Sequence, residues 1–266
     1  MITSVSDDQK IKIDALEAGV TDFLIKPINS VEFIARSRNL LEMRKFQIII
    51  QNKALLLEEE VNKATQRIVE REQETLMVLG KISELKDFET GHHILRVARY
   101  SKLLAAGMGM TKDEVQILFY ASQLHDIGKV GTSEMILLKP GKLTYEEFEI
   151  MKQHAVNGFN LLKNTSSKYL KAGSIVALSH HERFNGNGYP SGQKGGQIPI
   201  QGRIVAIADT FDALLSKRSY KEPWSFEDAV EYIIQEKGKH FDPQIVDVFI
   251  AKLKEIKKIC ESLKDV

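Results

Sequence analysis

The feature that most limits the fold of this chain is a stretch of fifty residues, Ser30 to Leu79, without proline or glycine. At 1.5 Å per residue it predicts one helix of roughly 75 Å, too long to lie along a single small domain. Apolar residues recur along it at alternating spacings of three and four, broken once at Gln47, which is typical of a coiled-coil seam. They are Leu40, Met43, Ile50, Ala54, Leu57, Val61, Ala64 and Ile68.

The seam loses its phase near Arg71 and Thr75 before apolar residues resume at Leu76, Leu79 and Ile82, as in a stutter. The alternative is one amphipathic helix packed on its own domain. The length favours a parallel dimeric coiled coil, so we expect a homodimer in which this helix couples an upstream sensor to a downstream domain.

Histidines and carboxylates form the second informative pattern. The candidates, in chain order, are Glu89, His93, His125, Asp126, His154, His180, His181 and Asp209. A mixed set of this kind without thiolate suits Fe, Mn, Zn or Ni and indicates a hydrolytic or oxygen-handling site. One zinc ion takes only three or four protein ligands. Eight candidates therefore imply two or three metal ions, provided that they converge.

Local spacing supports convergence. Glu89 and His93 are four residues apart and would share one face of a helix. The run QLHDIGK predicts a largely buried helix, on which the adjacent His125 and Asp126 diverge by about 100° and would stand between two metals, with Asp126 as the bridging ligand. Asp209 ends an apolar run, and a carboxylate buried there needs a partner.

Some histidines have simpler explanations. We interpret His92 and His240 as surface or capping residues and leave both out of the site. His154 taken alone is weak support for a ligand. Spacing alone leaves the metal site and a purely structural role open.

Four segments carry a resemblance to a known family: ETGHH from Glu89, HDIGK from His125, HHERFNGNGYP from His180, and IADTFDALLSKRSY from Ile207. Together they resemble the HD-GYP branch of the HD phosphohydrolases, over roughly Lys86 to Phe249. The resemblance implies an all-α catalytic domain whose di- or tri-metal centre activates a bridging hydroxide and hydrolyses cyclic di-GMP to pGpG, and it leaves open whether pGpG or GMP is the final product. It favours iron or manganese, with nickel or zinc as alternatives.

The resemblance also implies residue roles. All eight candidates above would be metal ligands, with Glu89 the variant associated with a third ion. Asp126 and Lys129 would be catalytic, with Lys129 on the scissile phosphate. The other substrate-binding positions are Tyr189, Asp212, Arg218 and Lys221. Lys129 and Arg218 would neutralise charge that develops on the phosphodiester; the alternative is a solvated basic face. Asp212 would bind the dinucleotide or orient a ligand.

The segment from Glu182 to Pro199 holds five glycines and two prolines, so it predicts an extended, sharply turning loop directly after two proposed ligands. Such a loop would act as a partial lid. The other interpretation is a surface on which signalling partner proteins dock.

The N-terminal segment, with Ile2 to Val5, a helix from Asp7 to Ala18, and Thr21 to Pro27, resembles the last part of a two-component receiver domain. Less than half of a receiver is present, and the phosphoacceptor strand is not in it. We expect that it accepts no phosphate and buries too little surface to fold alone. It would pack against another chain or form a swapped dimer.

We therefore predict an incomplete receiver-like remnant (1–30), a helical coiled-coil linker (31–85) and an HD-GYP catalytic domain (86–266). The net charge of +1 favours no nucleic-acid polymer as partner, the single Cys260 excludes an internal disulfide, and no apolar run is long enough for a membrane span. We expect a bacterial cytoplasmic protein. Three functions stay open: a cyclic di-GMP phosphodiesterase, a phosphodiesterase for a related cyclic dinucleotide, or a catalytically idle nucleotide- or metal-binding signalling module.

Overall fold

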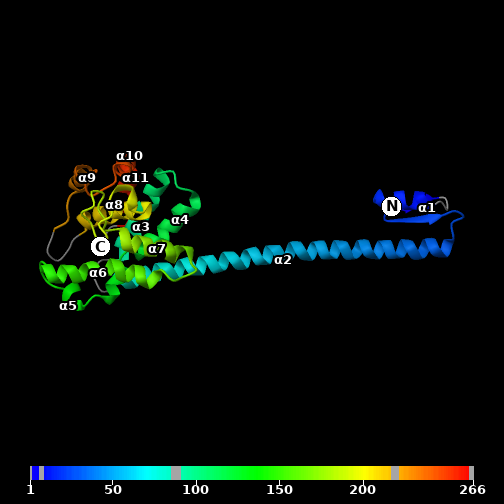
Figure 1. Cartoon of the computed structure of the whole chain (residues 1–266), viewed down its shortest axis with the longest axis horizontal. Coiled ribbons are helices and arrows are strands. Elements are labelled where there is room, and N and C mark those ends of the chain that lie inside the picture. The colour runs from blue at the N-terminus through cyan, green and yellow to red at the C-terminus, as the bar shows by residue number, and fades with distance from the viewer. Residues whose placement is uncertain (1, 6–8, 85–90, 217–221, 264–266) are drawn as a thin grey trace. The chain divides into compact units, whose positions relative to one another are not determined.

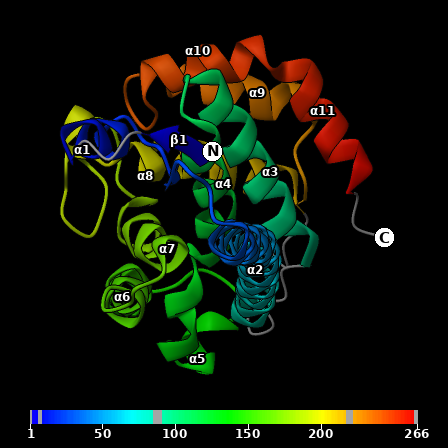
Figure 2. The same cartoon turned by 90° about the vertical axis from the view of Figure 1, so that its right-hand side faces the viewer.

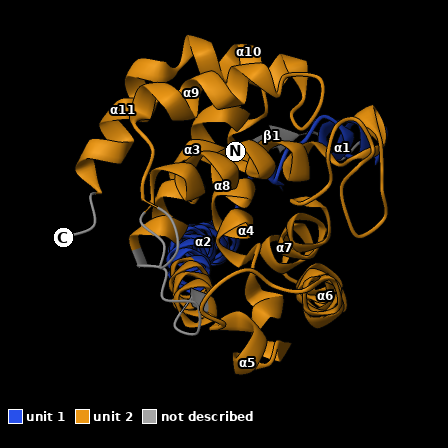
Figure 3. Cartoon of the chain, turned by 90° about the vertical axis from the view of Figure 1, so that its left-hand side faces the viewer, with its two compact units in different colours: residues 1–69 blue, residues 70–266 orange. Residues whose placement is uncertain are grey.

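The computed structural model describes residues 2–5, 9–84, 91–216 and 222–263, and its chain divides into two compact units, 1–69 and 70–266 (Figures 1 and 3). The elements are β1 (Ile2–Val5), α1 (Gln9–Glu17), β2 (Asp22–Ile25), α2 (Ser30–Glu84), α3 (Gly91–Gly107), α4 (Lys112–Ala121), η1 (Ser122–Leu124), η2 (Ile127–Gly131), α5 (Glu134–Leu137), α6 (Tyr145–Leu162), α7 (Lys168–Ser179), η3 (Gly195–Gln197), α8 (Ile200–Leu215), α9 (Phe226–Gln235), α10 (Pro243–Ala251) and α11 (Leu253–Ser262). Here η denotes a 3-10 helix. No helix among the described residues is both long and apolar enough to cross a membrane.

The first unit begins with a strand–helix–strand segment, in which α1 lies within the helix predicted from Asp7 to Ala18. β1 and β2 pair in parallel, with Ile2 opposite Asp22 and Val5 opposite Ile25. Among the described side chains of residues 9–69, Leu24 is the one apolar residue in the core, at 3% exposed. That this segment does not fold by itself stays a prediction.

The long helix predicted from the absence of proline and glycine is confirmed as α2, and it continues beyond the predicted end at Leu79. Asn29 caps its first turn, because its side-chain oxygen accepts hydrogen bonds from the backbone N–H groups of Val31 (2.9 Å) and Glu32 (3.3 Å). The seam residues from Met43 to Ile68 are exposed; Leu57 and Val61, for example, are 60% and 62% exposed.

The last part of α2 belongs to the second unit and packs there. Leu76 is 2% exposed and lies in a small apolar cluster with Tyr120 and Tyr169. The Gln73 side chain donates to the Tyr169 hydroxyl and accepts from the Tyr120 hydroxyl, each over 3.0 Å. The loss of heptad phase thus coincides with the point where the apolar face of α2 begins to pack into the core of the second unit.

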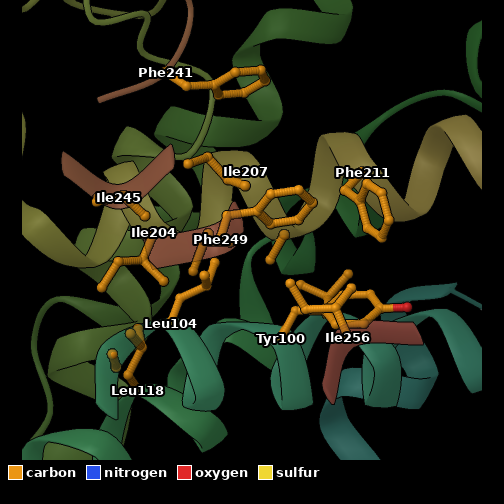
Figure 4. Close-up of a cluster of buried hydrophobic side chains, with 14 of the residues drawn as sticks. Tyr100, Leu104, Leu118, Ile204, Ile207, Phe211, Phe241, Ile245, Phe249 and Ile256 are labelled. Carbon is orange, nitrogen blue, oxygen red and sulfur yellow. The ribbon is translucent and has the colours of Figure 1, made fainter. Parts of the chain in front are cut away.

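The second unit is built around α8, which is apolar on most of its surface. Its Ile204, Ile207 and Phe211 are fully buried and form the main core with residues of α3, α4, α9, α10 and α11 (Figure 4). The rings of Phe211 and Phe249 meet edge-on, with centroids 5.0 Å apart. Within residues 91–216 and 222–263 no strand is present, so the predicted all-α architecture is confirmed.

The helices of this unit lie in three sets. α9, α10 and α11 lie along one side and α5 and α6 lie at the opposite side, with α3, α4, α7 and α8 between them (Figure 2). Capping boxes begin α4 at Thr111 with Glu114 and α6 at Thr144 with Glu147. The segment 182–199 contains no α-helix, as its glycines predicted.

Candidate metal centre

The His125–Asp126 pair lies at a break between helical segments. α4 ends at Ala121, and the pair falls between η1 and η2. The prediction of a regular helix through QLHDIGK is therefore wrong, whereas the predicted burial is correct: His125 is 1% and Asp126 9% exposed. Gly128 explains the break, since a Cβ atom there would lie 1.9 Å from the carbonyl oxygen of His154. Only glycine allows η2 to approach α6 so closely.

Three imidazoles are oriented by the backbone. Nδ1 of His125, His154 and His180 donates to the carbonyl oxygen three residues earlier, over 2.8, 2.7 and 3.0 Å. A carbonyl oxygen only accepts hydrogen bonds, so the proton belongs on Nδ1 and Nε2 keeps its lone pair. The Nε2 atoms are therefore the ones available to a metal ion.

The candidate ligands gather into two groups, within each of which one donor atom per residue lies within 4.8 Å of the others. They are the Asp126 group (Asp126, His154, His180 and His181) and the His93 group (His93, His125 and Asp209). Two ligands bound 2.1 Å from one ion at a tetrahedral angle lie about 3.4 Å apart. In the Asp126 group, Nε2 of His154 and Nε2 of His180 are 3.5 Å apart. In the His93 group, Oδ1 of Asp209 lies 3.6 Å from Nε2 of His93 and 3.7 Å from Nε2 of His125, so each group could hold a metal ion.

Asp126 connects the two groups. Its Oδ1 lies 3.3 Å from Nε2 of His154 and 3.6 Å from Nε2 of His180. Its Oδ2 lies 3.3 Å from Nε2 of His125 and 2.7 Å from the ammonium of Lys129. A carboxylate with its two oxygens turned to different ligand groups has the geometry that a bridging ligand requires.

Two buried atoms where the two ligand groups meet, one of His125 and one of Asp126, are suited to bind a cation. Nε2 of His125 and Oδ1 of Asp126 are buried and form no hydrogen bond of normal geometry with the described residues. Buried polar atoms without partners are costly, and one divalent ion near each would satisfy both. Imidazoles and carboxylates without thiolate are the ligands that Mn, Fe, Ni or Zn accept. The residues present therefore fit a metal centre.

The pKa values of the candidate ligands also fit a bound cation. Burial opposes protonation of His125, but the carboxylates of Asp126 and Asp209 outweigh it and raise the pKa of His125 to about 9. Burial also opposes ionisation of Asp126, yet Lys129 and His125 hold the pKa of that carboxyl well below its usual value. Where no cation is bound, the field of these carboxylates favours a second proton on Nε2 of His125, the atom that a metal ion would otherwise occupy. In the Asp126 group, burial lowers the pKa of His154 to about 4, which keeps its imidazole neutral as a ligand must be.

The glycine-rich loop is held against the site by Glu182, which is 3% exposed. Its two carboxylate oxygens accept from the backbone N–H groups of Ser191 (2.7 Å) and Gln193 (3.0 Å). At Gly188 a Cβ atom would lie 2.2 Å from the backbone nitrogen of Arg183, so only glycine fits there. The middle of the loop therefore packs directly against its first residues.

Tyr189 of the glycine-rich loop contacts two candidate ligands, His181 and His154. Its ring stacks on His181, with centroids 4.7 Å apart and an angle of 29° between the rings. It also meets the ring of Phe148 edge-on at 6.2 Å, and burial raises the pKa of its hydroxyl. The predicted substrate-side tyrosine thus borders the Asp126 group.

Asp212 is fully buried, at 0% exposed. One of its oxygens accepts from Nδ1 of His93 over 2.7 Å, and the guanidinium of Arg96 contacts both oxygens. The aspartate therefore lies behind a candidate ligand. Three further site predictions, Glu89, Arg218 and Lys221, fall outside the described residues.

Two residues near the site were not found from the sequence. His240 is half-buried rather than exposed: its ring stacks on Phe241 with centroids 4.2 Å apart, and its carbonyl oxygen accepts from the backbone N–H of Phe184 in the glycine-rich loop. Arg96 was missed although a signal existed, because it follows His93 by three residues just as Asp212 follows Asp209. Two such pairs on facing helices bring all four side chains together.

Comparison with known proteins places these features in a family. The model of the HD domain family matches residues 44–245. The cyclic di-GMP phosphodiesterase response regulator RpfG of Xanthomonas campestris is 40% identical over 260 residues, which cover 98% of this chain and 69% of that protein. A cyclic di-GMP phosphodiesterase of Thermotoga maritima is 40% identical over 271 residues, covering 99% of this chain and 74% of the other.

A 3'3'-cGAMP-specific phosphodiesterase 2 of Vibrio cholerae is 38% identical over 239 residues, covering 90% of this chain and 46% of that protein. Among solved structures, the V. cholerae cyclic GMP-AMP specific phosphodiesterase V-cGAP3 has a TM-score of 0.55 at 22% identity, over 73% of this chain and 51% of the other. That likeness shows the fold alone. The family match and the identity to relatives aligned along nearly the whole chain lead to one conclusion: the chain belongs to the HD domain family, in the group whose members include cyclic di-GMP phosphodiesterases.

Proposed function

We propose that this chain is a metal-dependent phosphodiesterase that hydrolyses cyclic di-GMP to pGpG and on to GMP. The observation that carries the proposal is the position of Asp126 between two groups of metal-ligating side chains. Two-metal sites of this kind are typical of enzymes that cleave phosphodiesters. The relatives in Xanthomonas and Thermotoga that bear this activity in their names support the choice of substrate.

Bound divalent ions supply Lewis acidity toward the phosphodiester and lower the pKa of a coordinated water. The side chains do the rest. The ammonium of Lys129, held 2.7 Å from Oδ2 of Asp126, carries positive charge to the edge of the site, where it would meet the negative charge that grows on the phosphoryl oxygens. Tyr189, stacked on His181, would close the substrate side of the Asp126 group and limit access of bulk water.

We propose iron or manganese as the ions, with nickel or zinc as alternatives, since the donor set accepts all four. The two ligand groups suggest two ions, and Glu89 would add a ligand for a third. Arg218 and Lys221 would grip the phosphates of the dinucleotide, Arg218 with two parallel donors and Lys221 as a point charge.

A related cyclic dinucleotide is the second candidate substrate. The V. cholerae relative named as specific for 3'3'-cGAMP aligns with 90% of this chain at 38% identity, nearly the identity of the cyclic di-GMP enzymes. The two substrates differ in one base, so the walls of the base pockets decide between them. A ratio of kcat/KM values for the two substrates above about 100 in either direction would name the physiological one.

The deciding experiment is anaerobic purification, elemental analysis of the bound metal, and chromatography of the products formed from cyclic di-GMP by the same sample. We expect two or three ions per chain and the appearance of pGpG followed by GMP. The double variant His125→Ala, Asp126→Ala should lose metal and turnover, while His92→Ala, at an exposed histidine of the same protein, should keep both. A full metal load without product from either dinucleotide would favour an idle signalling module instead.

We further propose that the first part of α2 forms a parallel homodimeric coiled coil. The support is the exposure of the heptad seam, where Ile50, Leu57 and Ile68 are 65%, 60% and 67% exposed. An apolar stripe of this length repeating every seven residues is stable when a second copy of the same helix covers it.

Light scattering coupled to size-exclusion chromatography tests the dimer. Leu57→Asp places a charge in the seam and should shift the mass from dimer to monomer. Leu56→Asp is the matched control, since Leu56 is 61% exposed but lies off the seam. A monomeric wild-type protein, or equal masses for both variants, would contradict the coiled coil.

The domain division at residues 30 and 85 and the location in the bacterial cytoplasm complete the proposal. In this division the receiver-like remnant packs against a second chain, and signalling partner proteins reach the enzyme through α2 or the glycine-rich loop.

A further inference from the structure

A chain of hydrogen bonds runs from the end of α11 to a candidate metal ligand. We propose that Arg96 and Asp212 are positioning residues that set the orientation and tautomer of His93 and so the affinity of the His93 group for its ion. The inference rests on the proposed metal-dependent function, but it concerns one ligand group and can fail while that function stands.

Asp212 is the centre of this network. Its Oδ2 accepts from Nδ1 of His93 over 2.7 Å, and its Oδ1 accepts from Nε of Arg96 over 2.7 Å. Because the carboxylate only accepts, it places the proton of His93 on Nδ1 and leaves the lone pair on Nε2. That Nε2 atom lies 3.6 Å from Oδ1 of Asp209, on the metal side of the ring.

Arg96 fixes the carboxylate in turn. Its Nη2 also donates to Oδ2 of Asp212 (2.9 Å), so the guanidinium and the carboxylate form a two-pronged pair. Nη2 further donates to the hydroxyl of Ser216 (3.2 Å), and Nη1 donates to the carbonyl oxygen of Leu263 (2.8 Å). With its edges occupied in this way, the planar group has one orientation, which the single ammonium of a lysine cannot reproduce.

The contact with Leu263 ties the network to the end of the chain that the structure describes. α11 is anchored by Ile256, which is fully buried, and by a hydrogen bond of 2.8 Å between the Tyr100 hydroxyl and Cys260 Sγ. Tyr100, Arg96 and His93 all lie on α3, at successive turns. The docking of α11 therefore helps to hold Arg96, and through Arg96 the imidazole of His93.

His93 differs in this respect from its neighbours. His125, His154 and His180 donate Nδ1–H to backbone carbonyls, which no substitution removes. His93 donates to a side chain that can be substituted. The two ligand groups can consequently be separated by experiment.

The test compares Asp212→Asn and Arg96→Lys with Arg203→Lys. An asparagine amide can donate to Nδ1, which would put the proton of His93 on Nε2 and remove the metal-binding lone pair. Arg203 is the matched control, because it too is an arginine paired with a buried aspartate, Asp242, and it makes no described contact with either ligand group. Metal-free protein would be titrated with Mn²⁺ against a chelating dye, and melting would be followed by circular dichroism.

We expect Asp212→Asn and Arg96→Lys to weaken one Mn²⁺ site about 10- to 100-fold and leave the other unchanged. Arg203→Lys should lower the melting temperature without changing either affinity. Ser216→Ala removes one contact of the same network, so it should fold even if the stronger variants do not, and weaken the same site a few-fold. The absorption spectrum of Co²⁺-loaded protein should change at one site only.

Equal Mn²⁺ affinities in the Asp212, Arg96 and Arg203 variants, or an unchanged affinity in Ser216→Ala if the others do not fold, would overturn the positioning role. So would equal weakening of both sites, since it would indicate a general loosening of the fold. The proposed function is tested separately by product formation in the wild-type enzyme, so either idea can fail alone.

Discussion

Substitution of Gly128 by alanine tests whether close contact between η2 and α6 holds the metal centre in place. The new Cβ atom would meet the carbonyl oxygen of His154 at 1.9 Å and the backbone nitrogen of Gly158 at 2.5 Å. Ordinary contact begins at 3.4 Å, so η2 and α6 would have to separate by about 1.5 Å. Both obstacles are backbone atoms, which cannot turn aside as a side chain does.

Overpacking of this kind costs about 1–3 kcal/mol or more, which corresponds to a fall in melting temperature of roughly 2–12 °C for a unit of this size. The separation also moves His154 away from Asp126, and a displacement of about 1 Å at a reacting centre lowers turnover on the order of 100-fold. The assays are thermal melting by circular dichroism, metal content, and hydrolysis of cyclic di-GMP.

Gly131→Ala is the control within the same segment. A Cβ atom at Gly131 would meet its nearest neighbour, Nδ2 of Asn157, at 3.5 Å, an ordinary contact. That variant should melt and turn over like the wild type. If Gly128→Ala also melted and turned over like Gly131→Ala, the reasoning from close packing would be refuted.

The remaining predictions concern three residues. Lys129→Met should lower kcat about 100- to 1000-fold with metal content unchanged, because its ammonium neutralises charge in the transition state. Glu182→Gln should raise KM and cost about 1.5–3 kcal/mol of stability. The amide NH₂ of glutamine would face one of the two backbone N–H groups that now donate to the carboxylate, so one hydrogen bond would be lost. Burial and nearby Arg183 lower the pKa of His240 from 6.5 to about 4, so the folded state excludes a proton that the unfolded state binds. The metal-free protein should lose on the order of 3 kcal/mol through this group as the pH falls from 6.5 to 4, and His240→Gln should remove that part of the pH dependence.

Each of these has a control and a contrary result. Lys168→Met, at an exposed lysine, should keep full turnover; an equal loss in both lysine variants would argue against a role in charge neutralisation. Glu231→Gln, at an exposed glutamate, should leave KM unchanged. For His240, urea unfolding at a series of pH values is the measurement, and identical pH dependence in His240→Gln and the wild type would contradict the assigned cause.

The order of the candidate ligands along the chain made their convergence predictable, but not the way in which they divide into two groups. Adjacent residues such as His125 and Asp126 were expected to diverge, and the structure assigns them to different groups. The expected reason, a regular helix, was wrong. The break between η1 and η2 depends on how closely Gly128 approaches α6, a contact between segments almost thirty residues apart that no local pattern contains.

His240 and Arg96 illustrate the same limit. A lone histidine before an apolar residue has no periodicity that indicates burial, and its environment comes from the glycine-rich loop packed beside it. The spacing of His93 with Arg96 and of Asp209 with Asp212 is visible in the sequence. That the two pairs face each other depends on the packing of α3 against α8.

What the sequence by itself determined is local: a helix from the absence of proline and glycine, a turning loop from its glycines, and a ligand inventory from residue types. These depend on backbone preference and side-chain chemistry, which each residue carries with it. The tertiary structure alone decided which candidate ligands lie together, which ring nitrogen of His93, His125, His154 and His180 faces the other candidate ligands, and which buried aspartate contacts His93. Those outcomes depend on distances between helices far apart in the chain, and such distances follow from the packing of the whole core.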